Sequence, residues 1–227
     1  MRRVRVWDLP TRLFHWALVA AVAGAFITEN LGRMDWHAAC GLAALGLVVF
    51  RVAWGFLGGT YARFGQFLRG PAAIRDYLQG RWRGVGHNPL GALSVMALLG
   101  VVALQATAGL FGNDDSTFFG PLYALVSRET SDALMDLHEA GAGLVMALVL
   151  LHVAAIVYYA RVRREKLVKP MLTGWKDDAP DDAQDSRGGG PVAFVVAVAI
   201  AAAVMYAASG ALLPAPEPVA LPATPAW

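Results

Sequence analysis

Four histidines stand near the ends of long apolar stretches of this 227-residue chain, at His15, His37, His138 and His152. The last two lie fourteen residues apart on one stretch. An α-helix turns about 100° and rises about 1.5 Å per residue, so fourteen residues return to within about 40° of one face after about 21 Å. One helix therefore presents two imidazoles at two heights. Because imidazole nitrogens bind metals and haem iron, the spacing indicates two stacked metal-centred sites.

The composition places these histidines in a membrane protein. Hydrophobic residues make up 57% of the chain and charged residues only 16%, which is outside the usual range of soluble domains. A helix needs about 20 residues to cross about 30 Å of hydrocarbon. We therefore expect an all-α integral membrane helix bundle with five transmembrane helices, the fifth at the C-terminal end. The expected spans are 13–27, 37–57, 90–111, 134–159 and 192–213.

The order of these segments suggests four regions. Residues 1–176 form the membrane domain that contains all four histidines, and residues 177–190 form an acidic, Gly-rich cytoplasmic linker that we interpret as solvated. The extra transmembrane helix covers 191–213, and a Pro-rich extended tail covers 214–227. No β-strand is expected, because no alternation of apolar and polar residues is long enough. Cys40 is the single cysteine, which excludes an intrachain disulfide and a Cys-x-x-Cys-His haem attachment site.

Basic residues give the expected orientation. Of the 19 Lys and Arg residues, sixteen lie in the N-terminal segment, in residues 58–88 and after the fourth span. Cationic loops are retained in the cytoplasm. We therefore expect a multi-pass protein of the bacterial cytoplasmic (inner) membrane, with a cytoplasmic N-terminus and a periplasmic C-terminus. Because these charges spread over one membrane face, nucleic acid is not an expected partner.

This orientation sorts the four histidines into two pairs. His15 and His152 share the cytoplasmic level, and His37 and His138 share the external level. Each pair is suited to hold one haem, whose iron takes an axial nitrogen from either side. For a single intramembrane histidine, an interhelical hydrogen bond is the main alternative. It is a poor explanation for four histidines at two levels.

Zinc is the competing metal. Tetrahedral zinc needs four converging ligands, whereas the two pairs are expected about 20 Å apart. Asp136 and Glu139 stand near His138 and offer further ligands there. Nothing comparable stands beside His15 or His152, so the sequence favours haem.

Arg51 is a further candidate for cofactor binding. It follows His37 by fourteen residues, so it projects from a similar helix face near the cytoplasmic level. Its guanidinium is suited to pair with a haem propionate; the alternative is snorkelling to the membrane interface. Five glycines on the ligand-bearing helices either let a flat group approach the backbone or pack helices closely: Gly24, Gly41, Gly46, Gly141 and Gly143.

The fifth histidine, His87, precedes Asn88 and Pro89, which we predict to be the N-cap and first residue of the third helix. A structural role in this loop is favoured for His87. A proton-handling role at a cytoplasmic quinone pocket is the alternative.

Short motifs around these residues combine into one pattern over residues 4–176. They are Val4-Arg5-Val6-Trp7-Asp8 with Arg12, His15 and Trp16; His37, Gly41, Phe50-Arg51 and Trp54; Gly86-His87-Asn88-Pro89; and Leu137-His138-Glu139 with Leu151-His152. The pattern resembles the bacterial cytochrome b561 and nickel-hydrogenase cytochrome b family. The resemblance implies a four-helix core with two non-covalent b-type haems, ligated by His15 with His152 and by His37 with His138. The fifth helix departs from that pattern.

The function expected from the residues and the resemblance together is electron transfer across the membrane. A di-haem b-type cytochrome would carry electrons between the quinone pool and a redox protein, such as a c-type cytochrome or a hydrogenase or dehydrogenase subunit. Two alternatives stay open: a free-standing superoxide:quinone oxidoreductase of the cytochrome b561 type, and a non-haem membrane transporter or structural protein. The expected partners are membrane lipid, a quinone and the redox protein, and the sequence is also compatible with a homo-oligomer.

Overall fold

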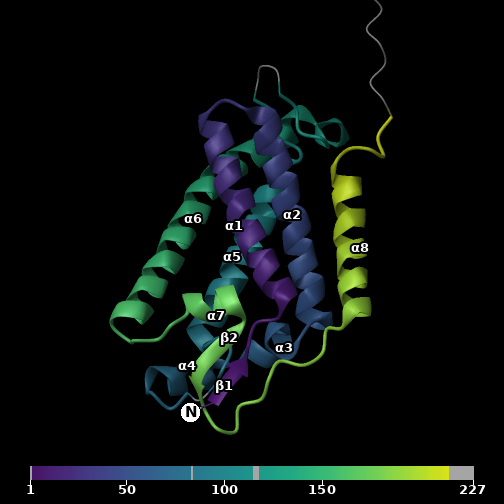
Figure 1. Cartoon of the computed structure of the whole chain (residues 1–227). Coiled ribbons are helices and arrows are strands. Elements are labelled where there is room, and N and C mark those ends of the chain that lie inside the picture. The colour runs from purple at the N-terminus through teal and green to yellow at the C-terminus, as the bar shows by residue number, and fades with distance from the viewer. Residues whose placement is uncertain (1, 83, 115–117, 215–227) are drawn as a thin grey trace, which may run out of the picture.

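Five long apolar helices dominate the computed structural model, which describes residues 2–82, 84–114 and 118–214 (Figure 1). All five are long and apolar enough to cross a membrane. The prediction of an all-helical membrane bundle is therefore confirmed. The five helices are α1 (Leu9–Asn30), α2 (Met34–Leu57), α5 (Pro89–Gly109), α6 (Arg128–Arg161) and α8 (Pro191–Ala208).

Helix α2 is the central element of the bundle. It packs against α1, α5 and α8, while α6 packs chiefly against α5. Small and aliphatic side chains of α2 fill the core, including Ala44, Leu45 and Val48, and Trp54 is only 1% exposed. Because successive helices run in opposite directions, α1 begins, α2 ends, α5 begins and α6 ends at one end of the bundle (Figure 1). We call this the N-terminal end and the opposite one the far end.

Side-chain caps fix where the helices begin. Asp8 accepts a hydrogen bond from the Thr11 amide at 2.8 Å, and Asn88 accepts one from the Gly91 amide at 2.7 Å. Asn88 and Pro89 thus occupy the predicted cap and first position of α5. Ser127 caps α6, which begins six residues before the predicted span. A longer α6 places His138 within the helix and not at its first turn.

A small sheet closes the N-terminal end and corrects the expectation of no strand. Strand β1 (Arg2–Arg5) pairs in antiparallel fashion with β2 (Trp175–Ala179), with Val4 opposite Lys176. Val4 is fully buried beneath this pair. The strands have four and five residues, too few for a convincing alternation pattern, and each needs a partner distant in sequence.

The segment interpreted as a solvated linker is partly packed. Ala179 and Ala183 are buried with Trp7 in a small apolar cluster, and the Ser186 amide donates to the Arg5 carbonyl at 2.7 Å. Packing follows from the sheet, because β2 carries the chain past β1 before α8 begins. The predicted Pro-rich tail lies outside the described residues from position 215 onward.

Short helices complete both ends. At the N-terminal end these are η1 (Thr60–Ala62), α3 (Phe64–Phe67), α4 (Pro71–Leu78) and α7 (Val168–Thr173), and at the far end η2 (Tyr123–Leu125). Helix α7 docks on the first turns of α1, where Arg12 donates to the Leu172 carbonyl and the Trp16 indole donates to the Met171 carbonyl. The chain after α6 is thereby tied to the helix that carries His15.

The fifth helix packs along α2. Phe194 of α8 meets Phe50 and Trp54 edge-on, with ring centroids 5.9 and 6.2 Å away. Farther along, a Cβ on Gly46 would lie 2.1 Å from the Met205 sulfur, so a missing side chain lets the two helices approach closely. Helix α8 is therefore an integral part of the bundle.

Candidate functional site

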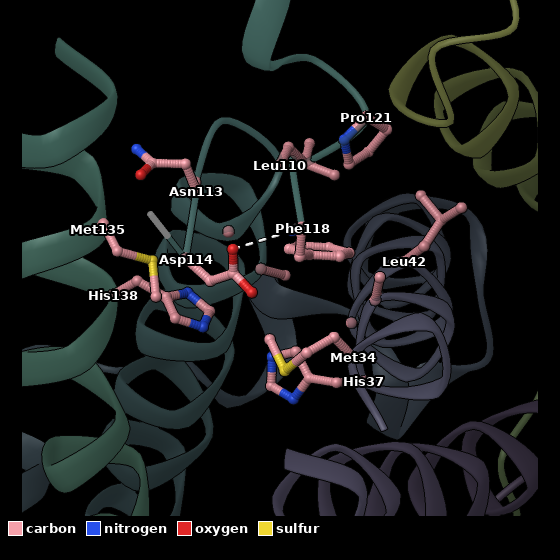
Figure 2. Close-up of a pocket in the computed structure, with 15 residues that line it drawn as sticks. Met34, His37, Leu42, Leu110, Asn113, Asp114, Phe118, Pro121, Met135 and His138 are labelled. Carbon is pink, nitrogen blue, oxygen red and sulfur yellow. Dashed lines mark hydrogen bonds between the residues drawn. The ribbon is translucent and has the colours of Figure 1, made fainter. Parts of the chain in front are cut away.

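The far-end site is built around two imidazoles from different helices. His37 lies in the first turn of α2 and His138 lies in α6; their ring centroids are 5.9 Å apart and their planes are at 81°. Both line one cavity beneath the connection between α5 and α6, which contributes Asp114 and Phe118 (Figure 2). The predicted external pair is thus brought together at one level.

Backbone carbonyls fix the tautomer of both rings. Nδ1 of His37 lies 3.0 Å from the Ala25 carbonyl oxygen, and Nδ1 of His138 lies 2.9 Å from the Gln105 carbonyl oxygen. A carbonyl oxygen only accepts, so each Nδ1 carries the proton and donates. In a neutral imidazole this leaves the Nε2 lone pair available. A hydrogen bond from the other ring nitrogen is the usual support for a metal-bound histidine.

Two glycines, Gly109 of α5 and Gly141 of α6, leave room for the contacts around His138. A Cβ on Gly109 would lie 2.8 Å from Cε1 of the His138 ring, and a Cβ on Gly141 would lie 2.2 Å from Oε1 of Gln105. Gln105 also donates to the His138 carbonyl at 2.7 Å. Gln105 and His138 thus each hydrogen-bond to the backbone carbonyl of the other, and these two bonds fix the position of α5 relative to α6 around this ring.

The cavity itself has room and an apolar wall. Its empty space is about 560 Å³, including the part open to solvent. Gly41 lines it, and a Cβ there would meet nothing within 4 Å. A flat group is thus able to approach the α2 backbone at this position.

The second pair lies toward the N-terminal end. His15 in α1 and His152 in α6 are both half-buried. Nδ1 of His15 is buried and has no hydrogen-bond partner among the residues that the structure describes. Helix α6 carries His152 on the same continuous helix as His138, about 21 Å away along the axis.

Arg51 lies beside this second level. Its side chain is 2% exposed, and neither Nη1 nor Nη2 has a hydrogen-bond partner within the described ranges. The guanidinium carbon lies 5.2 Å from the Phe64 ring centroid and 5.8 Å from that of Phe67. Arg51 therefore does not snorkel to the interface, because α3 folds over the end of α2 and encloses it.

His87 is enclosed by the same segment. Its ring packs between Trp7 and Phe67, at 4.6 Å from each ring centroid. Burial, together with the positive charge of Arg51, lowers the pKa of His87 to about 3. His87 is therefore neutral near pH 7.

Asp8 connects the start of α1 to the end of α2, because its carboxylate also accepts hydrogen bonds from the Trp54 indole and the Gly59 amide.

Comparison with known proteins shows the family of the chain. Residues 6–174 match the family described as prokaryotic cytochrome b561. The chain belongs to this family. Among curated proteins it is similar to the probable Ni/Fe-hydrogenase B-type cytochrome subunits of Azotobacter vinelandii (28% identity; 78% of this chain, 91% of the relative) and Rhodobacter capsulatus (26%; 77% and 83%). No solved structure matches the chain.

As a cytochrome b561 family member, the protein is a multi-pass membrane b-type cytochrome that functions in electron transfer. Its residues fit a b-type haem. The fit rests on the fixed tautomers of His37 and His138, on the unpartnered polar atoms of His15 and Arg51, and on the open space beside Gly41. In the part of the chain that is described, no three His, Cys, Asp or Glu side chains gather as a zinc site requires.

The five glycines singled out from the sequence divide into two groups. Gly24, Gly46 and Gly141 serve close packing, against Cys40, Met205 and Gln105 respectively. Gly41 and Gly143 face open space.

Sequence reasoning missed the support of His138. Gln105 is the one amide side chain of α5, an unusual residue within an apolar span, and this is a signal that points to an interhelical contact. Gly109 carried no signal, because nothing in its sequence context distinguishes it from the other glycines of the bundle.

Proposed function

We propose that this cytochrome b561 family member binds two b-type haems, one between His37 and His138 and one between His15 and His152. The observation that carries the proposal is the pair of Nδ1 hydrogen bonds at the far end, which leaves the Nε2 lone pairs of two histidines, from α2 and α6, available beside one cavity. We assign His15 of α1 and His152 of α6 the equivalent role at the other level.

When bound, b-type haem supplies one-electron chemistry, since its iron alternates between the ferrous and ferric states. The protein supplies binding and orientation. The Ala25 and Gln105 carbonyls hold the far-end imidazoles in the ligating tautomer. At the N-terminal end, the buried guanidinium of Arg51 offers N–H donors to a propionate. Because α6 carries one ligand of each pair, it sets the spacing between the two sites.

The orientation belongs to the same proposal. The N-terminal end, with β1, α3, α4 and the segment after α6, contains most of the basic residues. We infer that this end faces the cytoplasm, by the retention of positive loops, and that α8 ends at the periplasmic face of the inner membrane. The far-end pair then lies on the periplasmic side.

The redox partners follow from the relatives. Because the similar curated proteins are named as hydrogenase B-type cytochrome subunits, a hydrogenase is the first partner to test, and a quinone is the proposed membrane-soluble electron carrier. A c-type cytochrome or another dehydrogenase remains an alternative at the periplasmic face.

Haem stoichiometry in single histidine variants tests the proposal. The purified wild type is expected to contain two low-spin haems per chain and to titrate in two redox steps. H138A and H152A are each expected to lose one haem and one step, while H87A, which removes an imidazole from neither pair, retains both. If H138A keeps two low-spin haems with an unchanged spectrum, the ligand assignment is wrong.

A further inference from the structure

A second cavity lies at the N-terminal end of the bundle. It opens between α3 and the loop that precedes α5, and its empty space is about 440 Å³, including the part open to solvent. The residues that give it chemical character are Tyr61, Gln66, Arg69, Trp82, Val85 and His87.

An indole nitrogen without an acceptor marks this cavity. The Trp82 Nε1 atom is buried and has no hydrogen-bond partner among the described residues. An indole N–H is a donor only. The Tyr61 hydroxyl, in contrast, already donates to the Gln184 carbonyl at 2.7 Å. Buried donors are nearly always satisfied, so the unmet need here is for a ligand that brings hydrogen-bond acceptors.

The surrounding charge selects an anionic ligand. The connection between α2 and α5, residues 58–88, contains five arginines and one carboxylate, Asp76. That carboxylate is engaged by Arg81, which leaves it unavailable to Arg69 at the cavity. A ligand with negatively charged oxygens therefore satisfies both the donors and the charge.

The position of the cavity selects a lipid as the source of that anion. Helices α3 and α4 lie where α2 ends and α5 begins (Figure 1), at the level of the membrane interface. Large apolar side chains of the same region are exposed, with Phe56 and Leu78 each at 69% and Leu68 at 39%. Basic pockets beside spanning helices with apolar surface next to them are typical sites for acidic phospholipids.

We propose that this cavity binds the phosphate of an anionic phospholipid, with Trp82 and Arg69 as its donors and the acyl chains along the exposed apolar side chains of this region. The site holds the α3–α4 connection against the bundle. Since α3 also covers Arg51, lipid binding secures the enclosure of that guanidinium.

Native mass spectrometry of the full-length, haem-loaded protein tests this site, with phosphatidylglycerol and phosphatidylcholine as the probes. Wild type is expected to retain phosphatidylglycerol in preference. W82F keeps the aromatic ring but removes the N–H, and R69Q removes the charge; each is expected to weaken phosphatidylglycerol binding about tenfold. R75Q is the matched control, because it removes the same charge from the exposed side of α4, outside the cavity.

Two results would overturn the proposed lipid site. Equal weakening by R69Q and R75Q, with no effect of W82F, would show unspecific attraction to surface charge and overturn the site. Displacement of the lipid by millimolar inorganic phosphate, with equal thermal stabilisation by phosphate alone, would assign the site to a soluble anion. An unchanged Soret spectrum in W82F and R69Q keeps these results separate from any loss of haem.

Discussion

The His138 ring lies where α5 has no side chain. A Cβ at Gly109 would come within 2.8 Å of Cε1 and 3.1 Å of Nδ1 of that ring. We expect G109A to displace the imidazole from the Gln105 carbonyl and to lower the haem content of the purified protein by up to half. Haem per chain, measured by pyridine haemochrome and protein assay, gives the result.

A matched variant on the same helix provides the control. A Cβ on Gly100 meets nothing within 4 Å, and alanine is a better helix former than glycine. G100A is therefore expected to retain full haem content. Equal haem loss in both variants would mean that α5 tolerates no added methyl group, and the specific role of Gly109 would be refuted.

His87 makes stability depend on pH. In the unfolded chain its pKa is near 6.5, whereas burial lowers the native pKa to about 3. Between these values the unfolded state binds more protons, so stability falls as the pH drops from about 6.5, by at most about 1.4 kcal/mol per pH unit. Thermal melts of wild type at pH 7.5 and pH 5 are expected to show a larger loss than those of H87Q. Parallel losses in the two proteins would contradict this assignment.

At the scale of elements, α8 is the clearest target. It contributes Phe194 to the aromatic contacts with Phe50 and Trp54, but no proposed haem ligand. A chain that ends at residue 190 is expected to bind haem and to melt at a lower temperature, because one side of α2 loses its packing partner. A chain that ends at residue 214 removes only the Pro-rich tail and is expected to melt like wild type. Complete loss of haem on removal of α8 would place the helix within the cofactor-binding core.

The helices show which parts of the fold could be predicted from sequence. Hydrophobic length located all five spans, because a membrane helix must satisfy its own backbone hydrogen bonds over a known thickness. Caps such as Asn88 with Pro89 were equally local and equally predictable. The sheet was not predictable, since Val4 and Lys176 pair although they lie far apart in the sequence, and neither strand carries a pattern of its own.

The site likewise has features that could be predicted from sequence and features that could not. The depth of each histidine was predicted from helix position and loop charge, which placed His37 opposite His138; the centroids of the two rings lie 5.9 Å apart. Contacts that depend on exact helix rotation, such as Gln105 on the His138 carbonyl, need the packed structure. The enclosure of Arg51 likewise depends on the path of a short connection.

For the whole molecule, membrane orientation is the property to test. Sixteen basic residues in the segments assigned to the N-terminal end predict that this end stays in the cytoplasm. Reporters fused after residues 32, 85, 126 and 188 are expected to alternate, with cytoplasmic activity after 85 and 188 and periplasmic activity after 32 and 126. The reverse pattern would invert the proposed sides of the two histidine pairs.

The two-stranded sheet imposes an order on biosynthesis. Residues 2–5 leave the ribosome first, but their partner, residues 175–179, emerges only after four membrane helices have been made. The same late segment brings α7 to Arg12 and Trp16, on either side of His15 in the chain. The sheet is therefore able to close only late, after the fourth membrane helix has brought residues 175–179 back to the end of the bundle where β1 lies.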